Sequence, residues 1–120
     1  MLTTLKEVLA FAEEKKAAIQ AFNIDNMEIV QSIIKASEEE NYPVILAVGQ
    51  AAIKDGKLAL LAATAQVLAK KSPIPVVLHL DHGQSLEQVR MALDCGFTSV
   101  MIDGSKLPFH ENVEISKRAL

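Results

Sequence analysis

The sequence contains no tryptophan, one tyrosine and one cysteine, and aromatic residues make up only 4% of its 120 residues. The single cysteine, Cys95, excludes an internal disulfide and fits a reducing compartment. The chain has no basic patch or aromatic platform and a net charge of −3, so it is not typical of nucleic-acid-binding proteins. No apolar run approaches the ~20 residues that span a bilayer, and the opening residues do not resemble a signal peptide. We therefore expect a cytoplasmic protein with no nucleic-acid or membrane partner.

Small and branched apolar residues are abundant instead. Half of the sequence is hydrophobic, and almost all of that half is Ala, Val, Ile and Leu. This composition is typical of parallel strands buried on both faces and of alanine-lined helices packed against them. The length suits one small domain, and no linker or low-complexity segment divides it. We therefore treat residues 1–120 as a single domain.

Helical and strand patterns alternate along the chain. Hydrophobic periodicity predicts helices at residues 5–15, 27–40, 57–70 and 86–94, and from 108 onward. Apolar, β-branched runs predict strands at residues 17–22, 44–48, 76–80 and 98–102. Residues 49–52 are expected to form a turn after the second strand. Consecutive βα units wind right-handed into a parallel sheet, so an α/β fold is predicted.

Two architectures fit this alternation: a small doubly wound sheet, or half of an eight-fold βα barrel. The last predicted helix has no terminating glycine or proline, which favours the barrel. A complete barrel needs about 250 residues. The prediction is therefore a leading helix and about four βα units that form the N-terminal half of a (β/α)8 TIM barrel, with the remainder of the barrel absent.

Polar residues follow each predicted strand. These groups are Asn23-Ile24-Asp25-Asn26, Gly49-Gln50, Asp81-His82-Gly83 and Asp103-Gly104-Ser105. In a βα barrel, the C-terminal ends of the strands form the rim that carries the active site. The sequence therefore predicts that these groups gather at one rim.

Each polar group also fits a simpler role, the capping of the helix that follows it. For Asp25, Asn26 and Ser85, capping is the expected role. Asp81 and His82 precede a glycine turn and not a helix cap, which favours a functional role: an imidazole can bind a metal, and a neighbouring carboxylate can move protons. For Asp103 both interpretations stay open.

The other histidines form no convincing metal site with His82. His79 lies three residues earlier on the same strand, so the two side chains are expected on opposite faces, and we interpret His79 as a buried structural residue. His110 lies near a helix start and is expected to be solvated. Metal binding by His82 therefore needs ligands from elsewhere, since zinc sites take three or four. No lysine lies inside a predicted strand, which argues against a Schiff-base enzyme on this part of the chain.

Several motifs together resemble one known family. They are LHLDHG at residues 78–83, MIDGS at 101–105 and LPFHEN at 107–112. The sequence is similar, through these motifs, to the class II (zinc-dependent) fructose-bisphosphate aldolase family, which includes the tagatose-bisphosphate aldolases. AFNIDNME at residues 21–28 resembles the family's first-strand signature. The resemblance runs over essentially the whole chain and implies the N-terminal half of a barrel.

The resemblance implies reversible aldol cleavage of a ketose 1,6-bisphosphate, of the fructose or tagatose type, to dihydroxyacetone phosphate and glyceraldehyde 3-phosphate. It implies one catalytic Zn²⁺, with room for a second metal or a monovalent cation. Asp81 matches the catalytic proton-transfer residue, and His82 matches a zinc ligand. Asp103 matches an acidic residue near the metal or at a second metal site, and Asn23 matches a substrate-binding residue. The full-length form is expected to be a homo-oligomer, a dimer or a tetramer.

The sequence departs from the family pattern in three ways. One is local: His110 stands where the family's Pro-Phe-Glu-Glu-Asn string has its first glutamate. Gly49 replaces a serine that often contacts substrate, and the family's other zinc-binding histidines and phosphate-binding loop lie in the absent half. Three interpretations therefore stay open. Activity requires the missing half; or two copies close a pseudo-barrel through their unpaired sheet edges; or the chain is a catalytically inactive sugar-phosphate-binding or interaction half-barrel.

Overall fold

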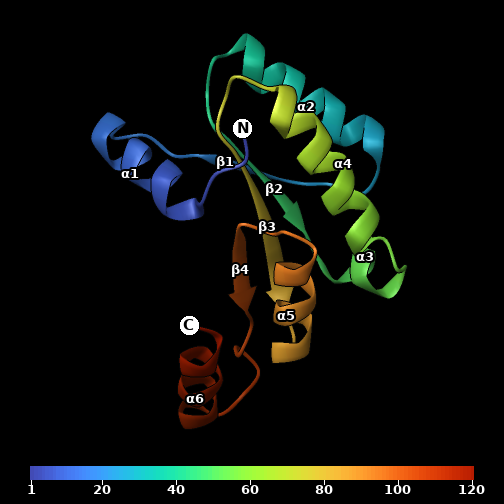
Figure 1. Cartoon of the computed structure of the whole chain (residues 1–120). Helices are drawn as coiled ribbons and strands as arrows, with labels where there is room; N and C mark the ends of the chain where they lie inside the picture. Colours follow the sequence, from blue (N-terminus) through green and yellow to red (C-terminus); the bar gives the residue numbers. More distant parts are fainter.

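A four-stranded parallel sheet with helices packed on it forms the centre of the computed structural model, which describes residues 1–120 (Figure 1). The elements are, in order, α1 (Leu5–Lys15), β1 (Gln20–Asn23), α2 (Met27–Glu39), β2 (Val44–Val48), α3 (Gln50–Lys54), α4 (Leu58–Lys71), β3 (Val76–Gly83), α5 (Leu86–Asp94), β4 (Ser99–Ile102) and α6 (Phe109–Ala119). The strands are neighbours in chain order, β1-β2-β3-β4, and every pair is parallel. A doubly wound sheet would reverse its strand order at a switch point. The unbroken order is that of half a βα barrel, as predicted.

The helices begin where the sequence places capping side chains. Thr4 closes a capping box with Glu7 at the start of α1. The side chains of Asn26 and Ser85 accept hydrogen bonds from the main-chain N–H three residues further on, at 2.8 and 3.2 Å. Each such cap satisfies a main-chain donor that the first helical turn leaves free. The capping roles predicted for Asn26 and Ser85 are confirmed, whereas Asp25 does not cap α2 and instead pairs with Lys57 at 3.3 Å.

Three segments differ from the predicted strands and turns. β3 continues to Gly83, three residues beyond its predicted end at residue 80, so Asp81, His82 and Gly83 belong to the strand and not to a turn after it. β1 begins three residues later than predicted, because Lys16 adopts a left-handed conformation at the end of α1 and the N–H of Ala17 still bonds to the carbonyl of Ala12. Residues 49–52, predicted as a turn, contain the start of the short helix α3, for which Gly49 is the N-cap.

The main core lies on the face of the sheet that α2, α4 and α5 cover (Figure 1). Val44, Leu46 and Val48 of β2 point to this face and are almost completely buried. The residues between them point to the opposite face, where Ile45 packs with Val8 of α1. Both faces of β2 are therefore covered, which explains its uninterrupted apolar sequence.

The opposite face of the sheet is covered only in part. On this face, α1 packs against few buried residues. They are Ile45 of β2 and Val77 of β3. All residues of the edge strand β1 are exposed, and those of the edge strand β4 are half-buried. The prediction that the strands are buried on both faces is therefore wrong for the edge strands β1 and β4. The face that α1 covers only in part is the one that would line the inside of a closed barrel. No helix of the chain is long and apolar enough to cross a membrane.

Candidate functional site

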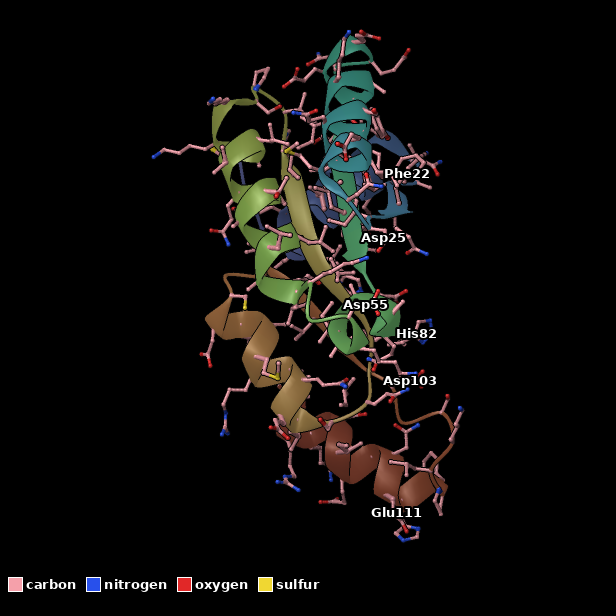
Figure 2. The ribbon with its side chains drawn as sticks, turned by 90° about the vertical axis from the view of Figure 1, so that its right-hand side faces the viewer. Phe22, Asp25, Asp55, His82, Asp103 and Glu111 are labelled. Carbon is pink, nitrogen blue, oxygen red and sulfur yellow. The ribbon has the colours of Figure 1, made fainter.

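The ends of β3 and β4 bring three of the predicted site residues together. The His82 Nδ1 atom lies 2.8 Å from Oδ2 of Asp103, and the two side chains are neighbours in Figure 2. The other ring nitrogen, Nε2, lies 3.7 Å from Oδ2 of Asp81. These residues are adjacent because β3 and β4 are parallel neighbours, so their C-terminal ends meet at one edge of the sheet.

β3 carries an irregularity at this point. Leu80 pairs with Val100 but Gly83 pairs with Ile102, so β3 has one residue more than β4 between these pairs. His82, inside the irregularity, has a φ of 53°, in the left-handed region that non-glycine residues rarely adopt. A bulge of this kind redirects a side chain. The simple alternation of faces along β3 therefore cannot be applied beyond Leu80.

Gly83 packs too tightly for a side chain. A Cβ atom there would lie 2.6 Å from the carbonyl oxygen of Met101 and 3.1 Å from Cδ2 of Leu80. The carbonyl of Gly83 also accepts a hydrogen bond from the N–H of Asp103 at 2.7 Å. The close approach of the two strands at Gly83 therefore helps to set the position of Asp103 opposite His82.

We expect Gly83→Ala to destabilise the chain by about 1–3 kcal/mol, since overpacking forces the two strands apart. Urea unfolding followed by circular dichroism measures this change. Gly49→Ser is the matched control, because no atom lies within 4 Å of a Cβ at Gly49 and serine is a favourable N-cap. Equal stability of Gly83→Ala and the wild type would contradict the packing argument.

A second group of predicted residues lies on the partly covered face of the sheet. A cavity of about 240 Å³ there is lined by Leu5, Ala21, Asn23, Ile45, Ala47, His79 and Asp81. Asn23 and His79 share this cavity because both pair with Ala47 of β2, which lies between them. Asp81 follows His79 by two residues on β3 and lines the same cavity. Asp81 is therefore common to the cavity and to the contact with His82.

The interpretation of His79 as a buried structural residue is correct only in part. The side chain is half-buried, and its Nδ1 lies 2.7 Å from Oγ of Ser99. Partial burial lowers the pKa of His79, against the opposing effect of the Asp81 charge. His79 is accessible because α1 covers only one end of this face. It is a polar neighbour of Asp81 that the sequence did not assign to the site.

Gly49 and Gln50 occupy different places at the start of α3. The space next to Gly49 is open, and no contact joins it to the other predicted site residues. Gln50 donates a hydrogen bond from Nε2 to the main-chain carbonyl of His82 at 2.7 Å. Sequence reasoning assigned no role to Gln50, and the only signal was a polar residue directly after a buried strand.

Charge and hydrogen bonding stabilise the ionised forms of both partners in the His82–Asp103 pair. Hydrogen bonds from Ser105 and from His82 hold the pKa of Asp103 well below its usual range. The hydrogen bond to Asp103, together with the charge of Asp81, raises the pKa of His82. Each shift favours a carboxylate opposite an imidazolium in the metal-free chain.

These shifts predict how the contribution of the pair depends on pH. Because the pKa of His82 is raised by folding, its contribution is present below the unfolded value of about 6.5 and is lost as pH rises through the folded value. Because the pKa of Asp103 is lowered, its contribution is present above about pH 4 and is lost in stronger acid. The stability difference between wild type and Asp103→Asn should thus be larger at about pH 5 than at about pH 9. A difference that grows toward pH 9, measured by urea unfolding, would contradict this.

The residues at the rim fit part of a zinc site. No group of three or more His, Cys, Asp or Glu side chains is arranged to hold a metal ion. In the neutral ring, Nδ1–H donates to the carboxylate of Asp103, which leaves the Nε2 of His82 free to act as a ligand. Metal-binding histidines commonly donate their second N–H to a carboxylate in this way. His82 and Asp103 therefore fit one ligand and the group that orients it.

The fold and the rim define a class of protein. It is a βα-barrel protein with parallel strands, and the C-terminal ends of two neighbouring strands carry an imidazole between two carboxylates. A family model described as "Fructose-bisphosphate aldolase class-II" matches residues 3–120. The chain belongs to this family.

Individual relatives agree with the family match. The chain is 44% identical over 120 residues to a fructose-bisphosphate aldolase from Giardia intestinalis, covering 99% of this chain and 37% of that protein. It is 43% identical over 122 residues to a fructose-bisphosphate aldolase from Staphylococcus epidermidis, covering 99% of this chain and 43% of that protein. The chain thus spans less than half the length of these relatives.

Solved structures support the same fold. The crystal structure of the YdjI aldolase from Escherichia coli K12 superposes with a TM-score of 0.93 at 33% identity, covering 99% of this chain and 46% of that one. A fructose-bisphosphate aldolase from Campylobacter jejuni superposes with a TM-score of 0.82 at 22% identity, covering 99% of this chain and 43% of that one, which bears on the fold alone. The sheet therefore corresponds to about half of a barrel, as predicted.

Proposed function

We propose that the chain is the N-terminal half of a zinc-dependent aldolase that reversibly cleaves a ketose 1,6-bisphosphate, of the fructose or tagatose type. The products are dihydroxyacetone phosphate and glyceraldehyde 3-phosphate. One observation carries this proposal. A free imidazole nitrogen of His82 lies beside Asp81, and the other ring nitrogen is held by Asp103. The site thus combines a ligand for an electrophilic metal with a carboxylate that can move a proton.

Asp81 is the residue that we assign to proton transfer. Its carboxylate accepts the proton of the substrate's C4 hydroxyl during cleavage and returns it during condensation. Asp81 lines the cavity that it shares with Asn23, whose amide we assign to binding substrate oxygens. Gly49 leaves open space where many family members place a serine, so substrate binding at that point relies on other groups.

His82 is the residue that we assign to zinc, with Asp103 fixing the tautomer of its ring. His82 would hold the zinc, which would supply a Lewis acid for the carbonyl group of the substrate. Since zinc takes three or four ligands, the rest of the site comes from the second half of the barrel. We also propose that the complete protein is a cytoplasmic homo-oligomer, a dimer or tetramer, with room for a second metal or a monovalent cation.

A chimeric barrel tests the proposal. In it, this chain replaces the matching N-terminal part of the Staphylococcus epidermidis relative, to which it is 43% identical. Cleavage of fructose 1,6-bisphosphate and of tagatose 1,6-bisphosphate is measured with a coupled assay for the triose phosphates. Turnover of either substrate that a chelator removes and zinc restores supports the proposal. A folded, zinc-loaded chimera without turnover of either substrate would overturn it.

A second candidate, a catalytically inactive interaction or sugar-phosphate-binding half-barrel, is favoured by the open edge of the sheet. A cavity of about 560 Å³ lies between β1 and α2, and its lining includes neither Asp81 nor Asp103. Phe22 lines it and is exposed (Figure 2). Native mass spectrometry of the chain, with and without zinc, distinguishes the candidates. A stable assembly that binds sugar phosphate equally well in the presence of a chelator would favour this second function.

A further inference from the structure

The main chain at His82 needs support from its surroundings. Its φ of 53° lies in a region that costs free energy for any residue with a side chain. Such a conformation persists only where surrounding contacts hold it. Figure 2 shows His82 next to Asp103, but Asp103 bonds only to the ring. The contacts that hold the main chain must come from other residues.

The first of these contacts comes from α3. Gln50, the first residue of this helix, donates from Nε2 to the main-chain carbonyl of His82 at 2.7 Å. The two residues are 32 positions apart in sequence. The contact therefore connects the end of β2 with the irregular part of β3.

The second contact comes from α5 through a pair of side-chain amides. Gln50 Nε2 lies 2.9 Å from Oε1 of Gln88, and Gln88 Nε2 lies 3.1 Å from Oε1 of Gln50. The same Oε1 of Gln88 accepts a hydrogen bond from the N–H of Gln84 at 2.8 Å. Together, the two glutamines bond the main chain at His82 and at Gln84, on both sides of Gly83.

Gln88 lies at a helix position where glutamine usually has a different hydrogen-bond partner. Gln88 lies three residues after the N-cap Ser85, where a glutamine commonly bonds back to the N-cap N–H in a capping box. Here its oxygen bonds instead to Gln84, one residue before the cap. A pair of amides is required because each side chain donates and accepts at the same time.

We propose that Gln50 and Gln88 are positioning residues of the candidate site. Their paired amides hold His82 in its left-handed conformation, so that the ring meets Asp103 and presents Nε2. Neither side chain touches the reacting atoms, and both act through the main chain of His82. What the ring then does rests on the proposed function, whereas its positioning does not.

The experiment is NMR spectroscopy of the metal-free chain with ¹⁵N-labelled histidine, at about pH 9, well above the ordinary histidine pKa. Gln50→Met and Gln88→Met keep the length of each side chain and remove its amide. We expect the wild-type His82 ring to carry its proton on Nδ1, and both variants to shift toward the tautomer mixture of a free imidazole. The amide proton of Gln84 should exchange about tenfold faster in Gln88→Met, from loss of one hydrogen bond.

Gln66→Met is the matched control. Gln66 Nε2 donates to the main-chain carbonyl of Cys95 at 2.6 Å, at the opposite end of α5. Gln66→Met thus removes a similar contact without touching the site, and the tautomer of the His82 ring should be unchanged. An unaltered tautomer in both Gln50→Met and Gln88→Met, or an equal shift in Gln66→Met, would overturn the proposal. A tautomer shift together with an inactive chimera would instead reject only the proposed function.

Discussion

Asp81→Asn should lower kcat for aldol cleavage in the chimeric barrel by about 10²–10⁴-fold, the usual contribution of a positioned general base. Asparagine has the size of aspartate but cannot accept the substrate proton. Zinc content should stay at the parent value, because His82 keeps its ring contact with Asp103. Steady-state kinetics combined with metal analysis of the same preparation measures both quantities.

Asp55→Asn is the control for this prediction. Asp55 is an exposed carboxylate at the end of α3, paired with Lys57 at 3.3 Å, and no hydrogen bond or ion pair joins it to His82 or Asp103. Its substitution should leave kcat unchanged. Should Asp81→Asn turn over substrate at the parent rate, the proton-transfer role would have to be given to another residue, and the neighbouring His79 would be the first to test.

The parts of the fold that could be predicted from the sequence are those set by local chemistry. The bounds of α1 and α5 match the prediction because a side-chain cap starts each helix. The parallel α/β fold followed from the alternation of strands and helices, since consecutive βα units wind in one direction, whereas the alternation alone left open the strand orders of a doubly wound sheet and of half a barrel. The meeting of His82 with Asp103 followed in turn, because parallel neighbours end at the same edge of the sheet.

The parts that could not be predicted depend on contacts between distant residues. The pairing of Gln50 with Gln88 joins two helices through side chains 38 residues apart, and neither glutamine belongs to a recognisable motif. The left-handed backbone of His82 depends on the extra residue in β3, which strand periodicity does not reveal. His79 was expected to be buried because a strand interior usually is. Its exposure depends instead on how little of the inner face α1 covers.

Zinc binding in the chimera should respond differently to the residues of the rim. His82→Ala removes a ligand, so we expect loss of bound zinc together with loss of activity. Asp103→Asn keeps the ligand but removes the charged acceptor of its Nδ1–H, and should weaken zinc binding by about 10–100-fold, as loss of such an orienting partner typically does. Titration against a chromophoric chelator at fixed pH measures both affinities.

The difference in zinc affinity between His82→Ala and Asp103→Asn is the more discriminating part of this prediction. His110→Ala is the control, since His110 is exposed and its ion pair is with Glu111 at 3.8 Å, and the zinc affinity of this variant should equal that of the parent. If Asp103 were itself a zinc ligand, Asp103→Asn would lose zinc as completely as His82→Ala. If Asp103 only orients the ring, Asp103→Asn binds zinc weakly and regains activity when zinc is raised, whereas His82→Ala does not. Full zinc retention in His82→Ala would remove His82 from the metal site, and the free Nε2 beside Asp81 would then need another role.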